Sequence, residues 1–482
     1  MTLHLNLRSG RACPIGLAVA CLAATWVPDR PIAQTATLVP SPVVIGPIPA
    51  TASPGDPSHD YPFFSTMVDL MSHGYIEEEF FFEGTATAYD IPASLNLANT
   101  PLTTANVVAS GLPYRTRMIV RRPVFLGSFN GTVLMEWQNV ATRYDFDAQW
   151  LTTHEHILRR GYAWVGVSAQ QAGVHAPGTG LRAWSPMRYG TLDLTAGGTI
   201  MDDSLQYDVF SQAAQAVRDP VGTDPMSGLN VERIIAAGAS LSAIRLVAYH
   251  NAVHPLAGVF DGFMPFLHGA RLRTDLGVKV FKVLSETDVA RDQVPYRQPD
   301  SNDLRRWEVA GTSHVDFRLV QQVIPLQARD LGAPQQPTNC TLPPYSRIPL
   351  AFVIDAAYDH MVAWVKHGKA PPHGADIETV DMPAVIARDS FGNAHGGIRL
   401  SQHAVPTATN TGLNGPPTNF CRTFGAHLPF DDETLATLYP DHQSYLAAVI
   451  EATHEAQRDG FIVGADAAST IRDAARSNIG RR

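Results

Sequence analysis

The stretch GASLSA, residues 238–243, nearly matches the pattern G-x-S-x-G, but Ser242 stands where the second glycine is expected. The apolar run VERIIAAG precedes it and predicts a buried strand, whereas LSAIRLVAY after it has the spacing of a helix. A nucleophilic serine of this motif occupies such a strand-to-helix turn. Ser240 is therefore the candidate nucleophile, although small residues also form ordinary turns of this kind.

The turn places physical demands on the residues around Ser240. The serine must adopt a strained conformation, and small residues two positions before and after it let the strand and the helix approach closely. Gly238 meets this demand, and Ser242 adds only a small side chain, which weakens the motif without refuting it. The main-chain N–H of Leu241, at the helix start, is expected to face a developing oxyanion.

A base and an acid follow in the order that this motif requires, serine, acid, histidine. The predicted strand VKVFKVLSE runs into Glu286 and Asp288, and the strand RRWEVAG runs into His314. All three stand at the carboxyl ends of strands, where sites form in open α/β sheets. We favour Asp288 as the acid because it lies in the turn beyond the strand, and Glu286 is the alternative. His314 is the predicted base.

A second oxyanion donor is expected in the loop after the strand GTVLMEW, which reads Trp137-Gln138-Asn139. The loop lacks a glycine-rich HGGG sequence. We predict that the main-chain N–H of Gln138 or Asn139 is the donor. The alternative is that Asn139 only caps the loop and that Trp137 only packs in the core.

The rest of the chain alternates between strands and helices, which predicts a mostly parallel sheet with helices on both faces, an α/β fold. A long stretch without clear period, around 170–203, reads as an insertion such as a lid or binding loop. We expect the insertion and the segment 263–269 to supply apolar walls of a substrate pocket, with packing on the core as the alternative. The predicted pocket residues are Trp137, Trp184, Met187, Phe263 and Phe266.

The N-terminal 36 residues predict an export signal and leader, because Arg8 and Arg11 precede a short apolar run. A membrane anchor or disordered leader is the alternative, and Cys21 could lie in a weak lipoprotein box. We predict a flexible segment over 37–59 and one domain over 60–482, with a C-terminal extension around 375–482. Cys340 and Cys421 are the cysteines outside the signal, and export favours a disulfide between them rather than two free thiols.

Composition excludes several classes of protein. Only 17% of the 482 residues are charged, and the formal net charge is −9. A nucleic-acid-binding protein would show a basic face instead. No apolar run beyond the N-terminus is long enough to predict a membrane span in the mature chain.

Three other histidines fit a catalytic or metal-binding role less well. His154 and His156 are two apart on a predicted helix and so face different ways, unlike the i, i+4 pair of a zinc motif. His395 is an alternative base, but the surrounding glycines read more simply as a tight turn. We expect neither a metal nor a cofactor.

These stretches together resemble a family of bacterial alpha/beta hydrolase domain-containing proteins, secreted or periplasmic esterases. The similar stretches include GTVLMEWQNV, VERIIAAGASLSA, VLSETDV and RRWEVAGTSHVD, and the resemblance covers about residues 60–470. The resemblance implies an alpha/beta-hydrolase fold and hydrolysis of a small carboxylic ester, and in this family a serine at the position of Ser242 is usual. SETDVARD also resembles the AE-x-DPLRD turn of hormone-sensitive-lipase-like esterases, which favours Asp288.

Three functions remain open at this point. The first is a serine carboxylesterase that works through an acyl-enzyme. Amide hydrolysis or acyl transfer would use the same residues. A catalytically silent binding protein could keep the fold alone, although silent relatives usually lose one of the three residues that are present here.

Overall fold

The computed structural model describes residues 39–333, 339–380, 384–415 and 419–481, and the predicted export signal and the possible lipidation site at Cys21 lie outside these ranges. Within them, ten strands form the central sheet in the order β10-β9-β8-β7-β4-β5-β3-β2-β1-β6. The six strands from β10 to β5 run parallel, and β5-β3, β3-β2 and β2-β1 pair antiparallel. The predicted α/β fold with a mostly parallel sheet is confirmed. The strands are β1 Val43–Ile45, β2 Tyr75–Tyr89, β3 Val107–Pro123, β4 Thr132–Trp137, β5 Ala163–Val167, β6 Val221–Gly222, β7 Arg233–Ala239, β8 Gly262–Phe266, β9 Lys279–Ser285 and β10 Leu304–Val309.

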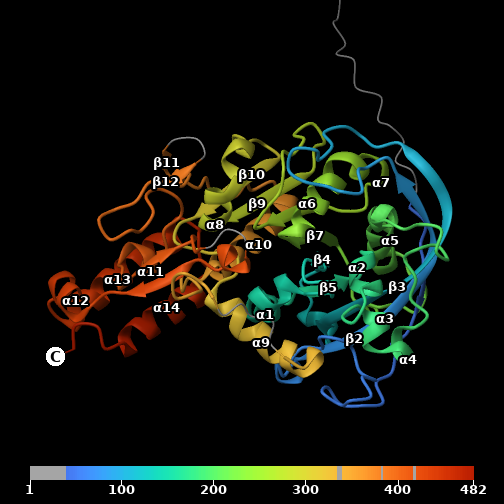
Figure 1. The fold of residues 1–482 in the computed structure, drawn as a ribbon, viewed down its shortest axis with the longest axis horizontal. Coiled ribbons are helices and arrows are strands. Elements are labelled where there is room, and N and C mark those ends of the chain that lie inside the picture. Colours follow the sequence, from blue (N-terminus) through green and yellow to red (C-terminus); the bar gives the residue numbers. More distant parts are fainter. Residues whose placement is uncertain (1–38, 334–338, 381–383, 416–418, 482) are drawn as a thin grey trace, which may run out of the picture. The chain divides into compact units, whose positions relative to one another are not determined.

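Helices cover both faces of this sheet (Figure 1). Phe263 and Phe266 are three positions apart on β8, so their side chains point to opposite faces. Phe263 packs against Tyr249, in the helical turn that continues α6, and Phe266 packs against Tyr358 of α10. Helices α6 and α10 therefore lie on opposite faces. The main helices of the sheet region are α1 Ala148–Arg160, α5 Gln206–Arg218, α6 Leu241–Ala248, α9 Phe317–Leu331 and α10 Leu350–His367.

The helix boundaries follow local chemistry that the sequence displays. Helix α1 ends at Gly161, whose φ of 72° is left-handed and therefore suits glycine. Helix α9 begins after Asp316, whose side chain accepts a hydrogen bond from the N–H of Leu319. Helix α10 ends at Gly368, shortly before two prolines. Asp316 thus ends the loop that follows β10 at the carboxyl edge of the sheet, whereas Gly161 lies just before β5, at the opposite edge.

The insertion 170–203 forms three short helices beside the antiparallel strands β2 and β3 (Figure 1). Arg115 of β3 and Asp193 exchange two main-chain hydrogen bonds, which join the insertion to the sheet. The hydroxyl of Tyr189 donates to Glu79 of β2 at 2.7 Å. The insertion thus extends the antiparallel part of the sheet. Its helices are α2 Gln171–His175, α3 Leu181–Trp184 and α4 Pro186–Tyr189.

The C-terminal part of the chain follows α10 and lies near the other end of the sheet, by β10 (Figure 1). Ile398 and Val309 form a bridge that joins this part to β10. No helix of the described residues is long and apolar enough to cross a membrane. The elements here are β11 Thr379–Val380, β12 Val385–Ile386, α11 Ser401–Ala404, β13 Ala408–Thr411, β14 Ala426–Pro429, α12 Asp432–Leu438, α13 His442–Arg458 and α14 Gly464–Arg476.

Candidate active site

Ser240 lies between β7 and α6 in a conformation that only a few non-glycine residues adopt. Its φ is 58° and its ψ is −118°. Such a backbone costs on the order of 1–3 kcal/mol and persists where neighbours hold it. One such contact is the hydrogen bond from the N–H of Ser240 to the carbonyl of Phe266, at 2.9 Å. The turn therefore has the strained geometry expected of a nucleophile elbow.

The residues two positions on either side of Ser240 explain how the turn closes. A Cβ atom at Gly238 would lie 3.1 Å from both the carbonyl carbon and the oxygen of Ser242, so the strand and helix leave little space there. Ser242 is 0% exposed, and its hydroxyl donates to the carbonyl of Gln138 at 3.3 Å. The serine that replaces glycine thus fits the contact and bonds to the loop after β4.

His314 and Asp288 meet at the carboxyl end of the sheet. His314 follows β10, and Asp288 lies in the short helix α8 Glu286–Asp288 directly after β9. The Nδ1 atom of His314 lies 2.7 Å from Oδ1 of Asp288. Among the described residues, the other ring nitrogen, Nε2, has no hydrogen-bond partner. This pairing would fix the tautomer that leaves Nε2 as the proton acceptor.

The carboxyl group of Asp288 is buried, and its surroundings favour the ionised form. Burial alone would raise its pKa, but the neighbouring His314 imidazole and the hydroxyl of Ser285 lower the pKa to about 2. Oδ2 of Asp288 accepts from the N–H of Ser285 at 2.9 Å and from its Oγ at 2.6 Å. The acid is therefore held in one orientation, with Oδ1 left for the histidine.

Glu286, the alternative acid, has a different set of partners. Its Oε2 accepts from the N–H of Gly311 at 2.7 Å, in the loop that leads to His314. Its Oε1 accepts from the N–H of Gly412 at 3.0 Å, from Thr411 at 3.1 Å and from the Arg388 guanidinium at 2.7 Å. Glu286 thus joins the histidine loop to the C-terminal part of the chain, and the geometry favours Asp288 as the acid.

The loop after β4 does not present the predicted main-chain donors. The N–H of Asn139 donates to the carbonyl of Phe146 at 2.9 Å, and the N–H of Gln138 faces the carbonyl of Val167 at 3.3 Å. The side chain of Asn139 donates to the carbonyl of Ala239 at 2.8 Å. The oxyanion role predicted for Gln138 and Asn139 is corrected: both fasten this loop to its neighbours.

Leu241 is the predicted oxyanion donor whose position agrees with the prediction. It is the first residue of α6, directly after Ser240. Among the described residues, its N–H has no main-chain acceptor. The N–H groups at the start of a helix carry partial positive charge and attract anions.

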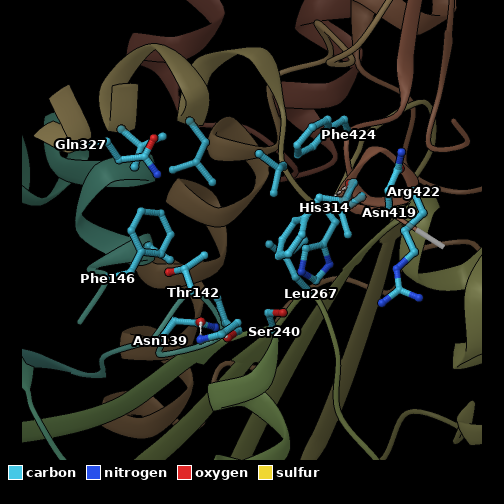
Figure 2. A pocket seen from close by; sticks show the side chains of 18 of the residues that line it. Asn139, Thr142, Phe146, Ser240, Leu267, His314, Gln327, Asn419, Arg422 and Phe424 are labelled. Carbon is cyan, nitrogen blue, oxygen red and sulfur yellow. Dashed lines mark hydrogen bonds between the residues drawn. The ribbon is translucent and has the colours of Figure 1, made fainter. Parts of the chain in front are cut away.

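A cavity of about 410 Å³ opens above Ser240 and His314. Figure 2 shows Ser240 at the base of this cavity, with His314 close to it and Gln327 on the opposite wall. The walls come from the segment after β4, from α9 and from the segment 419–424. Apolar side chains form much of them: Tyr144, Phe146, Leu267, Leu319, Val323 and Phe424.

The five side chains predicted to line the pocket lie elsewhere. Phe263 and Phe266 are buried on the two faces of β8, and Trp137 packs on Phe210 of α5. Trp184 packs on the segment before β2, where its ring stacks on that of His59 at 4.3 Å. Met187 is 94% exposed. The prediction was wrong because apolar composition does not distinguish a pocket wall from a core face.

Sequence reasoning missed the C-terminal wall of the cavity. Residues 419–424, which include a short helical turn, line it. A disulfide joins Cys421 in this turn to Cys340, with the two Cα atoms 5.3 Å apart. The predicted disulfide is present, and the pairing could have pointed to this segment, because it fastens an otherwise irregular turn beside the histidine loop.

The other histidines lie apart from the cavity. His156 on α1 contacts Asp359 of α10 at 3.1 Å, and His154 is buried against its own helix. His395 is exposed and lies in the turn-rich segment in which Gly396 bridges to Ile377 and Ala394 bridges to Arg388. None of the three lines the cavity around Ser240.

The chain is similar to one family model and to several solved structures. A family model described as alpha/beta hydrolase domain matches residues 44–472. No curated protein matches the chain. Among solved structures, the chain is similar to an alpha-beta serine hydrolase homologue from Coxiella burnetii, at 11% identity over 44% of this chain and 90% of that chain, with a TM-score of 0.27.

Two further solved structures are similar to the chain. One is an a/b serine hydrolase without lid from Xanthomonas campestris, at 13% identity over 53% of this chain and 97% of that chain, with a TM-score of 0.26. The other is a cold-adapted esterase from an Arctic intertidal metagenomic library, at 10% identity over 53% and 91%, with a TM-score of 0.25. The family model spans most of the sequence, and on that ground the chain belongs to the alpha/beta hydrolase domain family.

Proposed function

We propose that the protein is a serine carboxylesterase in which Ser240, His314 and Asp288 form a catalytic triad. The observation that carries the proposal is the strained backbone of Ser240, with φ of 58°, beside a histidine whose Nδ1 lies 2.7 Å from a buried carboxylate. Strain of this kind is kept where a nucleophile must project from a turn. Membership of the hydrolase family supports the same reading.

The proposed reaction proceeds through an acyl-enzyme. The hydroxyl of Ser240 attacks the ester carbonyl while Nε2 of His314 takes its proton. Asp288 stabilises the imidazolium, and the N–H of Leu241 stabilises the oxyanion. The intermediate then expels the alcohol, which receives the proton from His314. A water molecule then attacks the acyl carbonyl while His314 takes its proton, the bond between the acyl group and the Ser240 oxygen breaks, and His314 returns the proton to Ser240 as the acid leaves.

The substrate in this proposal is a small molecule. The cavity of about 410 Å³ is of a size that suits a small ligand, and its walls are largely apolar. An exported location remains part of the proposal and is supported by the Cys340–Cys421 disulfide, since such bonds persist in oxidising compartments. The single domain over 60–482 likewise remains proposed.

The test is the variant Ser240→Ala. We expect turnover of p-nitrophenyl acetate to fall by at least about 10³-fold, and labelling by a fluorophosphonate probe to disappear, because no other group would attack the ester. Ser242→Ala is the matched control, two positions away, and should keep the label. Retained labelling of the folded Ser240→Ala protein would refute the assignment.

A further inference from the structure

A polar cluster of Thr142, Tyr144 and Gln327 interrupts the apolar wall of the cavity. Figure 2 shows Thr142 and Gln327 on the wall that faces Asn419. The Nε2 atom of Gln327 donates to the hydroxyl oxygen of Tyr144 at 2.8 Å. Burial raises the pKa of Tyr144, and the neighbouring hydroxyl of Thr142 and amide of Gln327 oppose this rise. Tyr144 therefore keeps its hydroxyl hydrogen at neutral pH.

The two hydroxyl groups of this cluster carry more hydrogens than their surroundings accept. Each hydroxyl has one hydrogen to donate. The oxygen of Tyr144 accepts from Gln327, and the Oγ1 atom of Thr142 is buried. Even where the two hydroxyls bond to each other, they use only one of their two hydrogens. One hydroxyl hydrogen of the pair therefore has no acceptor within the part of the chain that the structure describes.

Two other buried tyrosines use their hydroxyl hydrogen within the protein. Tyr114 donates to Oε1 of Gln212 at 2.7 Å, and Tyr358 donates to Oε1 of Gln149 at 2.9 Å. Neither tyrosine lines the cavity. Tyr144, which is 1% exposed, differs because it accepts from its glutamine. A buried donor without an acceptor is unfavourable, and a ligand oxygen that accepted its hydrogen would remove the penalty.

Helix α9 shows how far the polar cluster lies from the catalytic residues. Leu319, Val323 and Gln327 are spaced four residues apart, so they follow one face of this helix over about two turns. Leu319 lies at the end near His314, since both also line a second cavity of about 20 Å³. The wall along α9 therefore changes from apolar beside the histidine to polar about two helical turns away.

We propose that the substrate is an ester that carries a second, hydrogen-bond-accepting oxygen, such as that of a ketone or an ether, beyond an apolar spacer. This inference rests on the proposed esterase function. With the ester carbonyl at Ser240, the spacer would lie along Leu319 and Val323. The remaining hydroxyl hydrogen of the Tyr144–Thr142 pair would be donated to the second oxygen. A plain hydrocarbon chain of the same length would leave that hydrogen without an acceptor, so the enzyme would discriminate against it.

The experiment compares esters in which one methylene group is replaced by a ketone. For the acyl side, the probes are p-nitrophenyl 4-oxopentanoate, 5-oxohexanoate and 7-oxooctanoate, each measured against the unsubstituted ester of the same chain length. For the alcohol side, 4-oxopentyl acetate is measured against pentyl acetate. We expect the ratio of kcat/KM, oxo ester over unsubstituted ester, to be at least about five in one pair. The pair with the highest ratio identifies the side of the ester that carries the oxygen.

Variants then assign the preference to the two hydroxyl groups. The double variant Tyr144→Phe, Thr142→Val removes both, and the ratio should fall at least about fivefold, to near one. The single variant with the larger fall identifies the hydroxyl that faces the substrate. The control, Tyr114→Phe, removes the hydroxyl of a buried tyrosine that also bonds to a glutamine but lies outside the cavity wall, and it should keep the wild-type ratio.

Two outcomes would overturn the inference alone. The first is hydrolysis of the unsubstituted esters with no preference for the oxo ester in any pair. The second is a wild-type ratio in the folded double variant. If the wild type hydrolyses none of these esters, the proposed function fails with the inference.

Discussion

The insertion 170–203 and the C-terminal segment, described over 410–415 and 419–424, are both largely irregular, yet of these two only the C-terminal segment lines the cavity of the candidate site. The insertion is fastened to β2 and β3 through Tyr189 and Asp193. The C-terminal segment is fastened to the turns after β9 and β10: the N–H of Gly412 donates to Glu286 at 3.0 Å, and the N–H of Val315 donates to the carbonyl of Thr423 at 2.8 Å. Buried anchors therefore decide where such a segment lies, whereas its composition does not.

The largest effect is expected from the anchor between the C-terminal segment and the histidine loop. Glu286→Gln removes the negative charge that pairs with Arg388. It also replaces one of the two carboxylate oxygens, which accept from the N–H groups of Gly311 and Gly412, by an amide nitrogen. We expect kcat for p-nitrophenyl acetate to fall at least about tenfold, and the free energy of unfolding to fall by about 3 kcal/mol. Kinetics and urea denaturation of the same preparation measure both.

Glu378→Gln is the control for this change, because Glu378 lies in the same C-terminal part but is exposed. It should leave kcat and stability near the wild-type values. If Glu286→Gln kept the wild-type kcat while its stability fell, Glu286 would support the fold without positioning His314.

A smaller effect on activity is expected when the disulfide between Cys340 and Cys421 is removed. Changing Cys340 and Cys421 together to Ala opens a link across 81 positions of the chain and frees the turn that carries Phe424 into the cavity wall. We expect the free energy of unfolding to fall by about 2–4 kcal/mol. KM should rise several-fold while kcat changes less, because Ser285 holds Asp288 and Thr287 accepts from the N–H of His314, whereas the turn bonds to the neighbouring N–H of Val315.

Reduction of the wild-type protein gives a parallel measurement. A reductant should reproduce the rise in KM in the wild type and have no effect on the double variant. An unchanged KM in both experiments would show that the cavity wall holds its shape without the disulfide. The C-terminal segment would then, like the insertion, have no effect on the candidate site.

The fold could be predicted from the sequence because its signals are local. Apolar runs such as VERIIAAG mark buried parallel strands, and Gly161 and Gly368 mark helix ends. The order of Ser240, Asp288 and His314 follows from the same pattern, since sites form at the carboxyl ends of parallel strands. The sequence favoured Asp288 over Glu286 as the acid, and the structure added the partners of each carboxylate: His314 for Asp288, and the N–H of Gly311 for Glu286.

The pocket could not be predicted in the same way. Its walls combine α9 with a turn more than 80 residues later in the sequence, and no local period records that contact. The donors after β4 were misassigned for a similar reason: the bridge between Asn139 and Phe146 is a contact across a loop that the sequence does not reveal. Pairings between irregular segments are therefore where the sequence is least informative.

The smallest effect on activity is expected from the insertion. Trp184→Ala removes a buried ring that stacks on His59 and whose Nε1 donates to the carbonyl of Asp330 at 2.7 Å. We expect the free energy of unfolding to fall by about 3–5 kcal/mol. At a temperature where the variant stays folded, kcat/KM for p-nitrophenyl esters should match the wild type, because the ring lies outside the cavity wall. Met187→Ala, at a fully solvated position of the same insertion, should change neither quantity. A raised KM in either variant would mean that the insertion reaches the substrate, and the contrast between the two segments would fail.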